Sequence, residues 1–293
     1  MAYYSGSAND MAALHAALVN ACVSEGWAWD SSTEMLSKGV LFLRLQVVSG
    51  YLTLLGRTSA AAGDMPNVVR VGQIGSVAVT WPVAYEVFVF DDEVYLVINY
   101  SVDYYQWAAF GRSVLGQPGT GMYVAASLGS TAADSSIAMG VTAGGSGLPA
   151  TTGAIFWEVN AAPTSNRNAW VMSDLDGQGW WLNTTLTGPK LGPAPIAPLI
   201  SLLPNSWNSE AVLLPIRAYK IRKESKISMV ADLANARYTR VDNYSPGQVI
   251  SLGDDRWKIF PFYRKNSVDR NGVPAGGVDH TGTLGWAIRY EGP

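Results

Sequence analysis

The chain has 293 residues, of which 48% are hydrophobic and 15% charged, and its net charge is −3. Its length suits one large β domain or two smaller ones. A single cysteine, Cys22, excludes an intrachain disulfide. The sequence has no signal-peptide pattern and no run of about 18 apolar residues, so we expect a protein that is made in a cytoplasm and does not insert into a membrane.

The charge is unevenly divided between the two halves of the chain. Residues 1–150 carry five basic and eleven acidic residues, whereas residues 151–293 carry fifteen and twelve. This polarity favours head-to-tail docking of copies and is too weak to predict a nucleic-acid partner. The chain also has 30 glycines, 11 tryptophans and 14 tyrosines. Many glycines and aromatic residues predict strands joined by tight turns. The low content of charged residues predicts that another subunit covers part of the protein surface.

An amphipathic helix is predicted near the N-terminus. Asn9 or Asp10 can cap it, and Gly26 suits its C-terminal end. Its apolar positions at helical spacing are Met11, Leu14, Leu18, Ala21 and Cys22. Cys22 is therefore predicted to be a small buried apolar residue. His15 lies off the apolar stripe and is predicted to be solvated.

Short strands are predicted after the helix. They are a strand beginning at Trp27–Asp30, a hairpin of Val40–Val47 and Tyr51–Leu55, an exposed loop over 56–67, and strands at Val68–Val71 and Val77–Trp81. The strongest pattern is a hairpin of Tyr85–Phe90 and Val94–Tyr100, apolar on both faces and therefore covered on both sides. Between its strands, Asp91, Asp92 and Glu93 are predicted to form a solvated turn.

Aromatic residues follow this hairpin. Tyr104, Tyr105 and Trp107 either fix the end of the sheet or contact a partner, and clustered aromatics usually supply buried area. Residues 111–121 are predicted to be a loop. Residues 128–153, rich in Gly, Ala, Ser and Thr, cannot bury much apolar area and are predicted to be a long surface loop or a flexible excursion. A phosphate-binding loop is disfavoured, because the AGGSG run lacks the Lys and the Ser or Thr that such a loop needs.

Two strands are predicted next, at Ala154–Val159 and Ala169–Met172. In DLDGQGWW, residues 174–181, the oxygen-bearing side chains of Asp174, Asp176 and Gln178 alternate as in the first half of a Ca²⁺ loop. Thr185 stands where that loop needs a bidentate Glu, so an Asp-Gly turn is favoured over a cation site. Trp180 and Trp181 are candidate contacts with a partner.

Residues 187–206 contain five prolines, which block a ladder or a long helix and predict an extended connector. Its candidate contacts with a neighbouring subunit are Pro193, Pro195, Ile196 and Leu199. Basic residues then line both faces of the segment 217–224, after a predicted strand at Glu210–Ile216. They indicate an exposed edge strand, with a polyanion-binding stripe as the alternative.

Regular short strands complete the chain. They are predicted at Ile227–Ala231, Tyr238–Val241, Gln248–Leu252, Trp257–Phe262 and Leu284–Tyr290. His280 falls in the last loop and is predicted to be solvated. The pattern predicts a mainly β protein: an antiparallel sandwich or barrel-like sheets with one N-terminal helix. We divide it into 1–127, a loop and arm region at 128–206, and 207–293, which is expected to pack with 1–127.

No catalytic motif is present. The sequence lacks HExxH, GxSxG and any Cys/His cluster, and its two histidines lie at opposite ends. We therefore expect no enzymatic activity, no cofactor and no metal.

Several long segments resemble a family of tailed-bacteriophage virion proteins encoded among tail and baseplate genes. They are AYYSGSANDMAALHAALVNACVSEGWAWD, EVYLVINYSVDYYQWAAFG, WNSEAVLLPI, ISMVADLANARYTRVDNYSPGQVISLGDDRWKIFPFYRKN and DHTGTLGWAIRY. The resemblance covers most of both ends and the middle, and it is weak over 56–70 and 128–200. It implies a structural subunit in the distal tail, made in the bacterial host cytoplasm and present in several symmetric copies.

The expected partners follow from that resemblance. They are other copies of the chain, in a trimer or hexamer, and other tail or baseplate proteins. A host-binding module at the tail tip is the main alternative, motivated by the 128–153 loop and DLDGQGWW, and its partner would be a cell-surface receptor. A capsid decoration protein is a further alternative.

Overall fold

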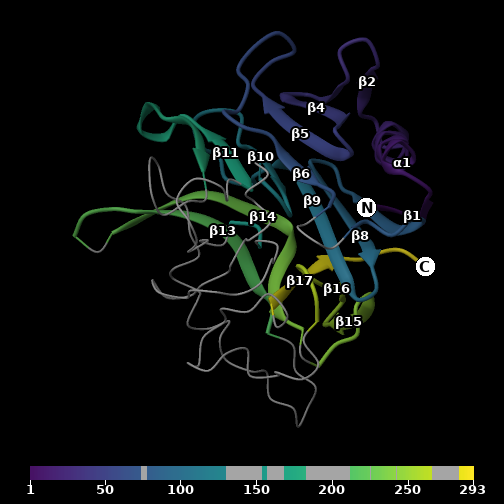
Figure 1. The fold of residues 1–293 in the computed structure, drawn as a ribbon. Coiled ribbons are helices and arrows are strands. Elements are labelled where there is room, and N and C mark those ends of the chain that lie inside the picture. The colour runs from purple at the N-terminus through teal and green to yellow at the C-terminus, as the bar shows by residue number, and fades with distance from the viewer. Residues whose placement is uncertain are drawn as a thin grey trace.

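A computed structural model describes residues 1–73, 78–129, 154–156, 168–182, 212–224, 226–241, 243–265 and 284–293. Within these ranges the chain forms three antiparallel sheets and one α-helix (Figure 1). The predicted mainly β fold is confirmed, and the sheets stack as in a sandwich without closing into a barrel. In the described part of the chain, no helix has the length and apolar character needed to cross a membrane.

The central sheet has seven strands. In spatial order they are β1 (Ala2–Ala8), β7 (Val83–Val89), β8 (Glu93–Ser101), β9 (Tyr104–Arg112), β10 (Met122–Ala126), β11 (Ala169–Ser173) and β12 (Gly179–Leu182). The short 3-10 helix η2 (Leu175–Gly177) links the last two strands. The predicted hairpin of β7 and β8 is therefore confirmed, and it lies inside this sheet.

Two outer sheets of five strands flank the central one. The N-terminal sheet runs in the order β2 (Ala28–Asp30), β3 (Met35–Lys38), β4 (Leu41–Val48), β5 (Tyr51–Arg57) and β6 (Val69–Val71). The C-terminal sheet runs in the order β13 (Leu214–Ile221), β14 (Ile227–Arg240), β17 (Leu284–Arg289), β16 (Asp255–Pro261) and β15 (Gln248–Leu252). Helix α1 (Met11–Ser24) packs against both the N-terminal sheet and strands β1 and β7 of the central sheet.

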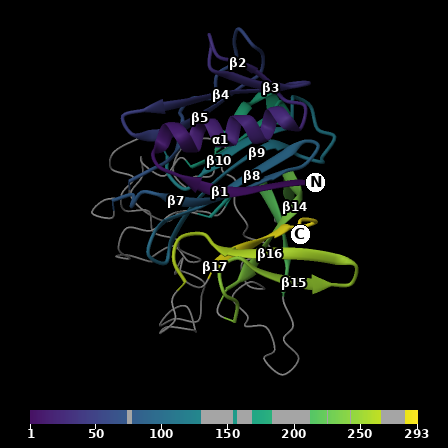
Figure 2. The same ribbon diagram turned by 90° about the vertical axis from the view of Figure 1, so that its right-hand side faces the viewer.

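Alternate side chains of β8 show how the layers stack. Leu96 and Ile98 face a core shared with α1 and the N-terminal sheet, whereas Tyr95 and Val97 face a core shared with the C-terminal sheet. Since successive residues of a strand point to opposite faces, the central sheet is the middle of three layers. Figure 2 shows these layers edge-on, with α1 beside the upper one.

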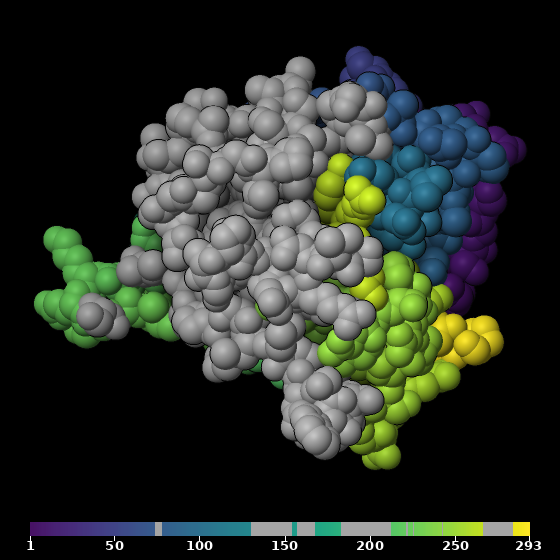
Figure 3. All heavy atoms as spheres, turned by 60° about the horizontal axis from the view of Figure 1, so that its bottom comes forward, coloured from purple at the N-terminus to yellow at the C-terminus, as the bar shows by residue number. Residues whose placement is uncertain are grey.

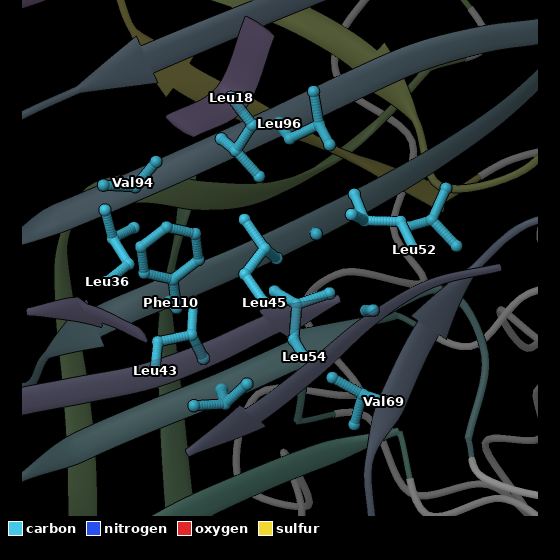
Figure 4. Close-up of a cluster of buried hydrophobic side chains, with 14 of the residues drawn as sticks. Leu18, Leu36, Leu43, Leu45, Leu52, Leu54, Val69, Val94, Leu96 and Phe110 are labelled. Atoms are coloured by element: carbon cyan, nitrogen blue, oxygen red, sulfur yellow. The ribbon is translucent and has the colours of Figure 1, made fainter. Parts of the chain in front are cut away.

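The core on the helix side is built mainly from leucine and valine. Figure 4 shows Leu18 of α1, leucines of β3, β4 and β5, and Val94 and Phe110 of the central sheet meeting there. The core on the opposite face is aromatic: the ring centroid of Trp107 lies 5.3 Å from that of Trp286 and 5.6 Å from that of Phe262. Such edge and tilted contacts add to the stabilisation from buried area.

The predicted helix is confirmed in detail. The Asp10 side chain accepts a hydrogen bond of 2.7 Å from the Ala13 backbone N–H, so Asp10 is the N-cap. Gly26 follows the helix with a φ of 82°, a conformation that glycine adopts without strain. Cys22 is buried, as predicted. His15 is not fully solvated: its Nε2 lies 3.0 Å from the Leu45 carbonyl oxygen.

Several strands carried no clear signal in the sequence. The strands β1, β3, β9 and β10 were not predicted. Strand β1 has small polar residues and pairs with β7, about 80 positions away. Strand β9 is buried on both faces between β8 and β10, so it lacks the alternation of a half-exposed strand, and the prediction of a loop was wrong for Gly111 and Arg112.

Other predicted elements need correction. Ala154–Phe156 form a buried turn and no strand, and Ala78–Trp81 are irregular. The separate strands predicted at Ile227–Ala231 and Tyr238–Val241 are one strand, β14, which continues through a bulge. The loop predicted at 56–67 is mostly exposed, although Gly56 and Arg57 end β5 and Met65 is buried.

The strand predicted at Glu210–Ile216 and the basic edge strand predicted at 217–224 form one strand, β13, which begins at Leu214 and ends at Ile221. The other predicted strands are confirmed within about two residues at each end. Residues 130–153, 157–167, 183–211 and 266–283 lie outside the described ranges, and with them the predicted loop, the connector and His280. The division into 1–127, 128–206 and 207–293 stays a prediction. Strands β11 and β12, which fall in its middle range, belong to the central sheet.

Candidate interaction surfaces

The outer end of a hairpin of β13 and β14 stands out from the three layers, whereas its inner part, with Ile216, Ala218 and Val230, is buried in the core. The outer end projects to the left in Figure 1, and the space-filling view of Figure 3 shows the same green segment standing away from the body. Only residues 236–240 of β14 pair with β17, and residues 227–232 pair with β13 alone. We call residues 214–232 the arm. It includes the basic edge strand predicted from the sequence, and β13 does lie at the edge of its sheet.

The outer end of the arm is basic. Residues 220–226 contain Lys220, Arg222, Lys223 and Lys226 and one acid, Glu224. Lys223 and Lys226 are exposed, and Lys226 Nζ lies 2.9 Å from Glu224 Oε2, a solvated pair worth little stability. Ile227 beside them is 50% exposed. The tip therefore offers cationic groups and an aliphatic side chain to a partner.

A bulge in β14 sets the angle of the arm. Between the pairs formed by Pro215 with Arg237 and Arg217 with Asp232, β13 advances two residues and β14 advances five. The extra residues bend the strand and leave backbone groups without ladder partners. The bulge thus marks the junction between the arm and the C-terminal sheet.

Glu93 satisfies the backbone donors of this bulge. Its Oε1 accepts a hydrogen bond of 3.0 Å from the Ala234 N–H, and its Oε2 accepts one of 2.9 Å from the Asn235 N–H. The Asn235 amide and the Tyr95 hydroxyl donate to Oε2 as well, at 2.8 and 2.9 Å. Glu93 is 2% exposed, so the prediction that it lies in a solvated turn was wrong.

Burial raises the pKa of the Glu93 carboxyl, although the hydrogen bonds from Ala234, Asn235 and Tyr95 act in the opposite direction. Burial also raises the pKa of the Tyr95 hydroxyl. A buried carboxyl is costly unless hydrogen bonds satisfy it, and here four donors do so. We call this group of contacts the Glu93 lock, since it ties the first residue of β8 to the bulge at the base of the arm.

Arg237 supplies the complementary half of the junction. Its Nη1 donates to the carbonyl oxygens of Leu233, Ala234 and Ala236 at 3.0, 2.9 and 2.7 Å. The carboxylate therefore satisfies backbone donors of the bulge while the guanidinium satisfies its acceptors. A bend held from both sides keeps one direction, so the arm is fixed at its base.

Two further contacts hold the arm along its length. The Asp232 N–H donates to Ser113 Oγ at 2.9 Å, and the Val114 N–H donates to the Asp232 carbonyl oxygen at 3.1 Å. Nearer the tip, Arg222 Nη1 lies 2.5 Å from Asp176 Oδ2. The segment predicted as a turn or a cation loop thus contributes Asp176 to an ion pair with the arm.

The rest of DLDGQGWW forms the link between β11 and β12, as the Asp-Gly turn prediction requires. Asp174, Asp176 and Gln178 are exposed. The residues that the structure describes contain no group of three His, Cys, Asp or Glu side chains placed to hold a metal ion.

The predicted aromatic contacts fall into two classes. Trp107 and Trp181 are each 1% exposed and lie in the core between the central and C-terminal sheets, and the Trp181 indole N–H donates to the Ser173 carbonyl oxygen at 2.8 Å. Trp180 is half-buried against Gly56 and donates to the Gly63 carbonyl oxygen at 3.1 Å. The indole rings of DLDGQGWW are therefore engaged inside the chain.

Tyr104 and Tyr105 are half-buried at the end of the β8–β9 hairpin. Arg264 Nη1 donates to the Tyr104 hydroxyl at 3.1 Å, and its guanidinium lies 5.0 Å from the ring centroid. The Tyr105 N–H donates to the Tyr263 carbonyl oxygen at 2.6 Å. These tyrosines join the central sheet to the chain beyond β16. The other predicted contacts, Pro193, Pro195, Ile196 and Leu199, lie outside the described residues.

A groove of about 490 Å³ lies beside the base of the arm. Its lining includes the exposed Asp91 and Asp92, the half-buried Phe90 and Leu115, and Val114, which is 61% exposed; Arg112 is the basic side chain among the lining residues. Ala234 and Asn235 of the bulge form part of its wall. Sequence reasoning missed this groove because its lining comes from four separate segments.

The groove and the arm are chemically matched. The groove carries the carboxylates of Asp91 and Asp92 and apolar side chains, with Arg112 and Met1 also in its lining, and the arm carries ammonium groups and an aliphatic side chain. Function is inferred below from these two surfaces and from the resemblance described above, because no protein-family model matches the sequence and no curated protein is significantly similar to it.

Proposed function

We propose that this protein is a non-enzymatic structural subunit of a tailed-bacteriophage virion, located in the tail tip or baseplate and assembled as a symmetric oligomer. The observation that carries the proposal is the arm: a hairpin fixed at its base by buried hydrogen bonds and projecting beyond the body of its own chain. A projecting element that is rigid in the free subunit can bind a neighbour without paying a large ordering cost.

The sequence gives independent support. The segments quoted above resemble virion proteins of the tail and baseplate gene region, and three of the five, the central EVYLVINYSVDYYQWAAFG, WNSEAVLLPI and ISMVADLANARYTRVDNYSPGQVISLGDDRWKIFPFYRKN, overlap β8, β9, β13 and β14. Of these strands, β13 and β14 form the arm, and β8 carries Glu93 and Tyr95 of the Glu93 lock. The low charge content of 15% also suits a subunit whose surface is partly covered by neighbours.

The test is the location and copy number of the protein in intact particles. An epitope inserted in this chain and imaged by electron microscopy should appear at the distal tail, in a small number of symmetric copies. Signal over the head would support a decoration protein instead, and no signal in mature particles would contradict a virion role. Adsorption assays on the same particles separate structure from attachment, because antibody bound to a host-binding module blocks adsorption.

A further inference from the structure

We propose that the arm of one copy docks in the groove of the next copy, so that copies join head to tail. This inference rests on the proposed oligomer and names the two surfaces that form it. The arm tip is defined as residues 222–224, 226 and 227, and the groove by Phe90, Asp91, Asp92, Val114 and Leu115.

Charge complementarity is the first reason to choose this pair of surfaces. Lys223 and Lys226 are exposed at the tip, and Asp91 and Asp92 are exposed at the mouth of the groove. Opposite charges at an interface fix its register and reject wrong partners. Arg112 also lines the groove, so the tip is expected to bind on the side of the two aspartates.

Apolar complementarity is the second reason. Ile227 is 50% exposed at the tip, and Val114 is 61% exposed in the groove beside Phe90 and Leu115. Aliphatic side chains left in water on both surfaces gain free energy when they cover each other, at about 25 cal/mol per Å² of apolar surface. Both surfaces therefore combine charged and apolar side chains, as protein interfaces do.

The geometry of the chain makes the contact intermolecular. The groove lies at the base of the arm, where Ala234 and Asn235 line it, and the tip lies five residues beyond Asp232, or roughly 17 Å along an extended strand. The Glu93 lock and the Asp176 ion pair fix the arm in its projecting direction. A tip held away from its own groove can reach only the groove of another copy.

Two different surfaces meeting in this way form a heterologous interface. Repeating such a contact closes a ring if the rotation between copies allows it. A second copy of the chain is thus the partner that these surfaces fit, and the product is a ring where that rotation closes and an open filament where it does not.

Charge reversal in the full-length protein tests the contact. We expect Lys223→Glu with Lys226→Glu, or Asp91→Lys with Asp92→Lys, to weaken self-association by about tenfold or more in sedimentation velocity. Combining all four changes in one chain should restore association, because each interface then pairs an acidic tip with a basic groove. The control is Asp254→Lys, which reverses an exposed acid in the β15–β16 turn and should leave association unchanged.

Cross-linking gives a second readout. Cys22 is fully buried, so thiols introduced by Lys226→Cys and Asp91→Cys are the accessible ones. The double variant should form covalent oligomers under oxidation, and each single variant should not form a ladder. Oligomers that persist through both charge reversals, or that fail to cross-link, would overturn the docking contact and leave the virion location untouched. A wild-type chain that stays monomeric at high concentration would overturn it as well.

Discussion

At the scale of single residues, one buried acid holds the junction between two layers. Glu93 is adjacent to Asp92 in the sequence, yet Glu93 accepts four hydrogen bonds and Asp92 is exposed. The sequence shows three consecutive acids and does not indicate which of them is buried, because three of the four hydrogen bonds come from Ala234 and Asn235, which lie 141 and 142 positions away. The difference between Glu93 and Asp92 comes mainly from these long-range contacts.

Replacing Glu93 is therefore expected to destabilise the fold and to loosen the base of the arm. Glu93→Gln puts an amide NH₂ against backbone donors, and we expect the free energy of unfolding to fall by about 1–3 kcal/mol. Trypsin should also cleave the arm faster at Lys223, since the bulge loses its acceptor. Chemical denaturation and timed proteolysis measure the two effects. Asp92→Asn is the matched control and should stay within about 0.5 kcal/mol; equal effects for the two variants would contradict the assignment.

A second residue-scale prediction concerns Lys258. Its Nζ donates to Glu86 Oε2 at 2.5 Å and to the Tyr3 hydroxyl at 2.9 Å, joining the C-terminal and central sheets. Burial lowers the pKa of Lys258, but these hydrogen bonds outweigh burial and raise the pKa above its ordinary value of 10.5. The pairing therefore stabilises the fold below about pH 10.5 and is lost as pH rises through the raised pKa.

Glu86→Gln should lower the free energy of unfolding by about 1–2 kcal/mol between pH 7 and 9. The difference from the wild type should shrink at more alkaline pH, where Lys258 loses its proton. Denaturation curves at several pH values measure it. Glu291→Gln removes an acid that is half-exposed and is the control, with a small effect at every pH. A difference that grows above pH 11 would refute the role of the Lys258 charge.

At the scale of elements, local signals decide what the sequence can predict. The α1 helix combines a capping residue, an apolar stripe and a terminal glycine within 17 residues, and all three act as predicted. Strand β9 has no comparable local sequence pattern that marks it as a strand. Its Ala108 and Ala109 are buried on opposite faces, so the strand has no polar face to alternate with. The basic composition of the arm is visible in the sequence, but the groove is assembled from distant segments.

The N-cap of α1 offers a direct test at this scale. Both Asn9 and Asp10 fit the sequence as caps, and the hydrogen bond to Ala13 selects Asp10. We expect Asp10→Ala to reduce the free energy of unfolding by about 1 kcal/mol, because one helix N–H loses its acceptor. Asn9→Ala is the paired control and should change it by less than half as much. Thermal denaturation of the two variants distinguishes the two caps. A larger loss of stability for Asn9→Ala than for Asp10→Ala would show that Asp10 is not the N-cap.

At the scale of the whole molecule, the central sheet belongs to both cores. Val97 faces the C-terminal sheet, while Cys22 of α1 lies in the core on the opposite face. Burial raises the pKa of the Cys22 thiol, so the folded protein should react slowly with thiol reagents. The shared sheet predicts that the two cores unfold together.

This coupling can be measured across the sheet. Val97→Ala should destabilise the protein by about 1–3 kcal/mol, because a buried side chain is truncated. Labelling of Cys22 should then begin at a correspondingly lower denaturant concentration, although the two residues lie in different cores. Val249→Ala, at a side chain that is 39% exposed, is the control with little effect. If Val97→Ala left the denaturant concentration for Cys22 labelling unchanged, the two cores would unfold independently.

The position of Met1 has a practical consequence for work on this protein. Met1 lines the groove, and its amine lies 3.4 Å from Glu291, next to Tyr290, whose hydroxyl donates to the Pro293 carbonyl oxygen at 2.6 Å. An affinity tag fused to Met1 would add chain at the groove wall and remove the amine charge. If copies dock through this groove as proposed, such a tag would weaken self-association and resemble a docking-defective variant. The exposed turn at Gly253 and Asp254 is the safer place for an epitope.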